Sequence, residues 1–248
     1  MIGIFDSGSG GLTVLQALKR RVPDADVTYF GDIRNAPYGS RTPHDLIRLT
    51  EAGIHTLQRC GATEIIVACS SVAPSVLAGV AEHSRLIDMT RPTARAMRKH
   101  AGKRVLLVAT PATVASRLYA DALEVIVQLD ELPIAGLASA IEFGAPVPEV
   151  ESIVRDAFQK REKQTYDQIL LGCTHYPLVK DVIEKEARNF FGAIECIDPA
   201  EAVAEESAER FDARGSGIVT FRISKDSSHF RNRVQELFPD AQHAIDVI

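Results

Sequence analysis

The chain has 248 residues, of which 46% are hydrophobic, and its formal net charge is −5 at pH 7. This length and composition favour a globular protein with one large or two modest domains, and the scattered Lys and Arg residues argue against nucleic acid as the main partner. Because the sequence shows neither an apolar run of roughly 18 residues nor a signal peptide, we expect a cytoplasmic protein that does not contact a membrane.

Apolar runs typical of β-strands alternate along the chain with amphipathic helical patterns. Helical spacing relates Leu12, Leu15 and Leu18, and another helix is predicted to start after Thr42 as N-cap, with Pro43 at its first position. This alternation predicts an α/β fold with mostly parallel sheets and helices on both faces. The predicted strands cover residues 2–5, 27–30, 64–68, 85–88, 104–109, 124–129, 168–172, 194–197, 217–222 and 243–247.

One sequence pattern occurs twice, each time centred on a cysteine. Residues 65–76 surround Cys69 and residues 169–179 surround Cys173, and each segment runs from a branched apolar stretch through cysteine to a hydroxyl residue and a proline. The two cysteines are 173 − 69 = 104 residues apart, and residues 2–7 match residues 105–110 at almost the same offset. The repeat predicts two pseudo-symmetric, doubly wound halves that face each other across a cleft.

We place the first half at residues 1–92 together with residues 203–248, and the second half at residues 93–202. In this arrangement each half contributes one thiol to the cleft. Each thiol is predicted to lie in the turn between the carboxyl end of a strand and the N-terminus of a helix, where a thiolate would be stabilised.

Two thiols that face each other suit a reaction that needs a base on one face of a carbon and an acid on the other. Removal of a proton from Cα followed by reprotonation from the opposite side inverts the centre, which is racemisation, and needs no cofactor if the thiolate is basic enough. An ordinary cysteine has a pKa of about 8.5 and is mostly protonated at neutral pH. The site must therefore lower that pKa or supply a base beside the thiol.

Charged and hydroxyl side chains accompany both cysteines. Asp6, in the glycine-rich run 6–11, is predicted to neighbour the turn of Cys69, and His175 follows Cys173 by two residues, so either side chain could move a proton to or from its thiol. Backbone N–H groups of the glycine-rich run could hold a carboxylate and the developing enolate together with hydroxyls. These hydroxyls belong to Ser7, Ser70, Ser71, Thr113 and Thr174.

Several motifs together resemble those of the glutamate racemase family, within the aspartate/glutamate racemase superfamily. They occur in the family's order over nearly the whole chain, and the segment around Cys173 is the most specific of them. The motifs are Asp6 to Val14, Pro37-Tyr38-Gly39, Ala68-Cys69, Ala112-Thr113 and Leu171 to Leu178.

The resemblance implies a cofactor-independent isomerase, without a metal, that interconverts L- and D-glutamate and supplies D-glutamate for bacterial peptidoglycan and cell-wall biogenesis, commonly as a homodimer. It implies that Cys69 and Cys173 are the catalytic acid/base residues, that Asp6 assists Cys69, and that His175 and Glu142 assist Cys173. The substrate-binding residues that it implies are Ser7, Pro37, Tyr38, Gly39, Ser70, Ser71, Thr113 and Thr174.

The chain departs from the family pattern at two places. The family usually has Asn-Thr after the first cysteine, where this chain has Ser70-Ser71, so one amide that can both donate and accept is lost. The second departure is the run 32–35, where the family tends to have a Thr-Ala-Arg type of run. The first departure leaves two alternatives open: a racemase for aspartate or another small acid, and a racemase-like fold that binds an acid or a protein partner without turnover.

Simpler interpretations apply to several of these residues. A lone cysteine is usually a small buried residue, so Cys60 and Cys196 are interpreted as structural or surface thiols, and the spacing of the four cysteines does not match a zinc site. Asp6 could be a turn or capping residue, and Glu142 could be a solvated helix end. The glycine-rich run lacks the lysine of a Walker motif and the G-x-G-x-x-G spacing, which argues against nucleotide binding.

Overall fold

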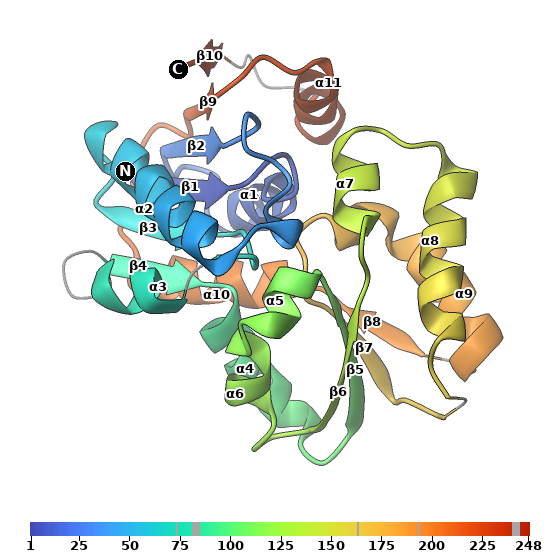
Figure 1. The fold of residues 1–248 in the computed structure, drawn as a ribbon. Helices are drawn as coiled ribbons and strands as arrows, with labels where there is room; N and C mark the ends of the chain where they lie inside the picture. The colour runs from blue at the N-terminus through green and yellow to red at the C-terminus, as the bar shows by residue number, and fades with distance from the viewer. Residues whose placement is uncertain (73, 81–84, 163, 193, 240–243) are drawn as a thin grey trace.

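The computed structural model describes residues 1–72, 74–80, 85–162, 164–192, 194–239 and 244–248. Over these residues the chain forms two parallel β-sheets with helices packed around them, as the sequence predicts (Figure 1). The strand order is β10-β9-β2-β1-β3-β4 in the first sheet and β6-β5-β7-β8 in the second.

The bounds of the elements follow the predicted alternation. The strands are β1 (Ile2–Asp6), β2 (Val27–Gly31), β3 (Glu64–Val67), β4 (Arg85–Asp88), β5 (Arg104–Ala109), β6 (Gln128–Pro133), β7 (Gln168–Leu171), β8 (Glu195–Ile197), β9 (Val219–Ile223) and β10 (Ala244–Val247). The helices are α1 (Leu12–Arg21), α2 (Pro43–Arg59), α3 (Pro74–Val80), α4 (Thr90–Met97), α5 (Pro111–Ala115), α6 (Leu118–Leu123), α7 (Leu137–Glu142), α8 (Val147–Gln159), α9 (Lys180–Phe191), α10 (Ala200–Arg210) and α11 (Ser228–Leu237). Short 3-10 turns are η1 (Tyr38–Ser40), η2 (Arg98–His100) and η3 (Tyr176–Val179).

The internal repeat corresponds to a repeated sheet topology. The order β2-β1-β3-β4 in the first sheet recurs as β6-β5-β7-β8 in the second, so the strands before Cys69 and Cys173 occupy equivalent positions. β9 pairs with β2 and β10 pairs with β9, so the C-terminal segment extends the first sheet. Each sheet takes its described strands from one predicted half, while the exact division at 92/93 and 202/203 remains a prediction.

Local signals explain where the helices begin. The hydroxyl of Thr42 accepts a hydrogen bond from the backbone N–H of Asp45, and Pro43 occupies the first turn of α2, as predicted. α1 begins at Leu12 and buries Leu12, Leu15 and Leu18, the residues with helical spacing. All five residues of β1 and of β2 are buried, as expected for parallel strands covered on both faces.

One strand prediction is wrong. Residues 124–129 were expected to form a strand, but the chain turns after α6 and the strand β6 begins only at Gln128. The backbone N–H groups of Ile126 and Val127 both donate to the carbonyl of Leu123, at 2.8 and 3.0 Å. These hydrogen bonds hold the apolar segment in a turn at the end of α6. Val125 is consequently 89% exposed. Residues 73 and 243, which fall in two predicted segments, lie outside the described residues.

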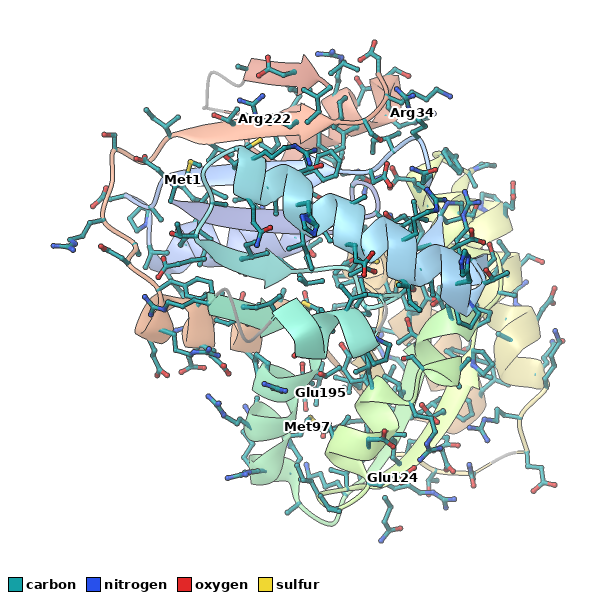
Figure 2. The ribbon with its side chains drawn as sticks, turned by 60° about the vertical axis from the view of Figure 1, so that its left-hand side comes forward. Met1, Arg34, Met97, Glu124, Glu195 and Arg222 are labelled. Atoms are coloured by element: carbon teal, nitrogen blue, oxygen red, sulfur yellow. The ribbon has the colours of Figure 1, made fainter. Side chains whose placement is uncertain are left out.

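One cluster of the apolar core contains buried side chains from both sheets and so packs them against each other. A single cluster of buried side chains includes Leu15 from α1, Val105 from β5 and Val203 from α10. Figure 2 shows the two ends of the molecule that this core joins, with Arg34 and Arg222 at one end and Met97, Glu124 and Glu195 toward the other. Among the described residues, every helix is too short or too polar to cross a membrane.

Candidate active site

The carboxyl ends of strands from both sheets meet at one small cavity. Cys69 lies two residues after β3 and Cys173 two residues after β7, and both line this cavity. Its volume is about 10 Å³, which is about enough for one water molecule. The residues that line it are Ser7, Pro37, Tyr38, Gly39, Cys69, Ser70, Ser71, Thr110, Ala138, Cys173, Thr174 and His175. Of the predicted site residues, only Asp6, Thr113 and Glu142 lie behind this surface.

Cys69 is buried, and its surroundings disfavour the thiolate. Burial, and after it the negative charge of Asp6, raises the pKa of the Cys69 thiol above its ordinary value. The hydroxyl of Ser7, whose oxygen lies 3.5 Å from the sulfur, and the backbone N–H of Ser71 lower the pKa but do not compensate. The expectation that the turn alone stabilises a thiolate is therefore wrong for Cys69, and a proton acceptor beside the sulfur is required.

Asp6, at the end of β1, joins the first half to the second. Its carboxylate accepts hydrogen bonds from the backbone N–H of Gly8 at 2.8 Å and from the hydroxyl of Thr174 at 3.1 Å. Burial raises its pKa, although the charge of His175 and the Gly8 hydrogen bond act in the opposite direction. Asp6 thus stabilises a turn, as the simpler interpretation holds, and is also a buried carboxyl group with an increased proton affinity behind the cavity surface.

Cys173 is linked to a series of buried, hydrogen-bonded side chains. Nδ1 of His175 lies 3.9 Å from the Cys173 sulfur, and Nε2 lies 2.7 Å from a carboxylate oxygen of Glu142. The same oxygen accepts hydrogen bonds from the backbone N–H of Ser9 at 2.8 Å and from the Ser9 hydroxyl at 2.6 Å. Glu142 is only 3% exposed, so its interpretation as a solvated helix end is wrong.

These contacts favour a protonated His175 paired with an ionised Glu142. Burial lowers the pKa of His175, but hydrogen bonds to Cys173 and Glu142 outweigh burial and hold this pKa well above its ordinary value. Burial raises the pKa of Glu142, but the hydrogen bond and charge of His175 and the hydrogen bonds from Ser9 outweigh it, so the pKa of Glu142 lies below its ordinary value. A proton donor therefore lies beside Cys173.

The glycine-rich turn of the first half packs directly on this series of side chains. A Cβ atom at Gly8 would lie 2.7 Å from the carboxylate of Glu142, and a Cβ atom at Gly10 would lie 2.5 Å from Nδ1 of His175. Glycine is required at both positions because the backbone approaches the second half so closely.

Hydroxyl groups from the two halves also meet at the cavity. The Ser71 hydroxyl lies 2.7 Å from that of Thr110 and 3.1 Å from that of Thr113, and the Ser70 hydroxyl lies 3.5 Å from that of Tyr119. Thr113 does not line the cavity itself, but its hydroxyl contacts Ser71 and Thr110, which do. Sequence reasoning missed Ser9, Thr110, Ala138 and Tyr119. Of these, Thr110 could have been found as a helix N-cap, because it precedes Pro111 in the same way that Thr42 precedes Pro43.

The remaining thiols lie outside the site. Cys60 caps the C-terminus of α2 and Cys196 lies in β8, where burial raises the pKa of its thiol to about 12. In the described part of the chain all four cysteines are free, and no cluster of His, Cys, Asp and Glu side chains would hold a metal ion.

Two related α/β halves that each place a cysteine on one buried cavity define a protein with a paired-cysteine site. The family model for Asp/Glu/Hydantoin racemase matches residues 9–207. A glutamate racemase of Ruegeria sp. (strain TM1040) is 37% identical over 206 residues, covering 74% of this chain and 76% of that protein. A glutamate racemase of Roseobacter denitrificans is 33% identical and covers 95% of each chain.

The solved structures agree with these relatives. The crystal structure of a glutamate racemase isoform from Bacillus anthracis has a TM-score of 0.87 and 26% identity, covering 100% of this chain and 97% of that one. The chain belongs to the aspartate/glutamate/hydantoin racemase family.

Proposed function

We propose that the protein is a glutamate racemase that interconverts L- and D-glutamate without a cofactor, by proton transfer between Cα and two cysteines. The observation that carries the proposal is that Cys69 and Cys173 come from opposite halves and line the same cavity. The relatives that are 33% and 37% identical are named glutamate racemases, which favours glutamate over aspartate as the substrate.

Each cysteine has its own proton partner in this mechanism. Asp6 accepts the proton of Cys69, and the resulting thiolate removes the Cα proton from one face of the substrate. Cys173 delivers its proton to the opposite face, and His175, held by Glu142, replaces that proton. For the other enantiomer the roles of the two cysteines are reversed. The proton from Cα thus ends on one sulfur, and the other sulfur supplies the new proton.

The substrate-binding residues form the polar surface around the two sulfurs. We propose that Ser7, Ser70, Ser71 and Thr174, with the backbone of Pro37, Tyr38 and Gly39, hold the carboxylates and the ammonium group, and that Thr113 supports Ser71. These hydroxyl and N–H groups are suited to stabilise the charge that develops on the substrate carboxylate as Cα loses its proton.

The cavity must open to admit an amino acid. Its volume of about 10 Å³ is too small for glutamate, and a second cavity of about 400 Å³ adjoins it. The two cavities share Pro37, Gly39, Thr110 and Ala138, so the larger one is the proposed entrance. Movement of the loop around Pro37 relative to α5 and α7 would connect them.

The proposal also includes the compartment, the use of the product and the oligomeric state. A glutamate racemase in the cytoplasm would supply D-glutamate for peptidoglycan, and the homodimer implied by the resemblance remains a prediction that light scattering of the purified protein would test.

The experiment that tests the function is solvent-deuterium exchange at Cα. Each enantiomer of glutamate and of aspartate is offered separately in D₂O, and Cα exchange is followed by NMR while inversion is followed by polarimetry. We expect exchange with inversion on glutamate. Faster reaction of aspartate would move the assignment to that acid, and binding without exchange of any substrate would contradict racemase activity.

A further inference from the structure

A buried carboxylate that takes no part in the proposed proton transfers lies behind the cavity wall. Asp32 follows β2 and is 6% exposed. Its oxygens accept hydrogen bonds from the hydroxyl of Tyr38 at 2.7 Å, from the hydroxyl of Ser224 at 2.6 Å and from the side-chain amide of Asn35 at 2.9 Å. All three donors are neutral, and they come from the loop after β2 and from the segment that follows β9. Asp32 therefore joins two segments that are far apart in sequence.

Tyr38 is the donor that reaches the cavity. It is 1% exposed, lines the cavity beside Pro37 and Gly39, and packs edge-on against Phe5 with ring centroids 6.2 Å apart. Burial, followed by the charge of Asp32, raises the pKa of Tyr38, so its hydroxyl stays protonated and donates a hydrogen bond to Asp32. Tyr38 thus connects the cavity wall at Pro37 to Gly39 with the Asp32 carboxylate.

Ser224 fixes Asp32 from the C-terminal segment. Its backbone N–H donates to the carbonyl of Gly31 at 3.1 Å, which continues the β2–β9 pairing by one residue. Its hydroxyl accepts from the backbone N–H of Arg34 at 3.0 Å, and its carbonyl accepts from the Arg34 guanidinium at 2.8 and 3.0 Å. Figure 2 labels Arg34 at the end of the molecule that carries β9. Ser224 lies beyond the residues 9–207 that the family model matches.

We propose that Ser224 is a positioning residue of the active site, which acts through Asp32 on Tyr38 and so fixes the wall of the cavity formed by residues 37–39. The hydroxyl of Ser224 does this by donating to Oδ1 of Asp32 while it accepts from Arg34, so that removing it leaves this oxygen with the longer, 3.1 Å hydrogen bond from the Asn35 amide. The C-terminal segment therefore contributes to substrate binding although none of its described residues lines the cavity. The kinetic part of this inference rests on the proposed function.

The kinetic test is the substitution Ser224→Ala. We expect the KM for glutamate to rise about ten-fold, the scale of one lost hydrogen bond to a charged group, with kcat within about three-fold of the unsubstituted protein. Ser224→Thr keeps the hydroxyl and is expected to restore KM. The control is Ser227→Ala, which removes the N-cap of α11 in the same segment without touching Asp32, and is expected to leave KM unchanged.

A double substitution tests whether the effect passes through Tyr38. Tyr38→Phe removes the hydroxyl at the other end of the chain of hydrogen bonds, so adding it to Ser224→Ala should raise KM by much less than the product of the two single effects. Multiplicative effects, or a KM in Ser224→Ala no different from that in Ser227→Ala, would overturn the proposal.

Amide hydrogen exchange separates a failure of this inference from a failure of the proposed function. Because it needs no substrate, exchange can be measured by mass spectrometry on peptides that cover residues 36–41, even if the protein racemises nothing. We expect these amides to exchange about ten-fold faster in Ser224→Ala and to be unchanged in Ser227→Ala. Equal exchange in Ser224→Ala and the unsubstituted protein would refute the positioning role.

Discussion

The close approach of Gly8 to Glu142 makes Gly8→Ala a sharp test of how the two halves assemble the site. The added Cβ would lie 2.7 Å from the carboxylate carbon and from both of its oxygens, whereas ordinary contacts begin at 3.4 Å. The carboxylate or the turn must therefore shift by about 3.4 − 2.7 = 0.7 Å. Such a shift would break or lengthen the hydrogen bonds, 2.6 to 2.8 Å long, that Glu142 accepts from Ser9 and His175.

The expected loss follows from those hydrogen bonds. Each hydrogen bond to a charged group contributes about 1.5–3 kcal/mol, so weakening two of them should lower kcat/KM by about 100-fold or more. Racemisation of L- and D-glutamate is measured by polarimetry, and thermal unfolding followed by circular dichroism shows whether the variant is folded.

The matched control for this prediction is Gly79→Ala. A Cβ atom at Gly79, within α3, would meet no heavy atom of the described residues within 4 Å, apart from its chain neighbours and the backbone of its own helix, so activity should be unchanged and the helix slightly stabilised. A folded Gly8→Ala protein with kcat/KM within about three-fold of the unsubstituted protein would refute the reasoning.

Three further predictions concern individual hydrogen bonds. In Glu142→Gln the partner charge is lost, so the pKa of His175 falls and the alkaline limb of the kcat/KM profile moves to lower pH; a pH profile that does not move would argue against a protonated His175. Tyr29→Phe removes the hydroxyl that donates to the carbonyl of Gly8 at 2.7 Å, and urea denaturation should show an unfolding free energy lower by about 1–3 kcal/mol. An unchanged unfolding free energy would show that this hydrogen bond does not stabilise the fold. Ser71→Ala removes the hydroxyl that contacts Thr110 and should raise the KM for glutamate about ten-fold in steady-state assays, and an unchanged KM would exclude Ser71 from binding.

The sequence predicted the parts of the fold that depend on local patterns. Branched apolar runs located β1, β3, β5 and β7 closely, and Thr42 with Pro43 located the start of α2. The convergence of Cys69 and Cys173 was predictable because parallel sheets place their sites at the carboxyl ends of the strands, and because the repeat put the two cysteines in equivalent positions of two halves expected to face each other.

Other features were not predictable because they depend on long-range contacts. Ser9 and Glu142 are 133 residues apart and Asp32 and Ser224 are 192 apart, and nothing in the local sequence pairs them. The apolar segment around Val125 has the pattern of a strand, but hydrogen bonds to the end of α6 leave it as an exposed turn. The turn at the end of β3 was expected to lower the pKa of the Cys69 thiol. Burial and the nearby negative charge of Asp6 raise this pKa instead, and both depend on residues distant in sequence.

The central claim is that both cysteines are required for inversion at Cα. The most direct measurement is the racemisation rate, starting from each enantiomer of glutamate, for Cys69→Ala and for Cys173→Ala, with Cys60→Ala as a control for the loss of a thiol away from the cavity. We expect inversion to be lost in both directions in each of the first two proteins and to be unchanged in the control. Inversion at an undiminished rate in either Cys69→Ala or Cys173→Ala would contradict the two-cysteine account.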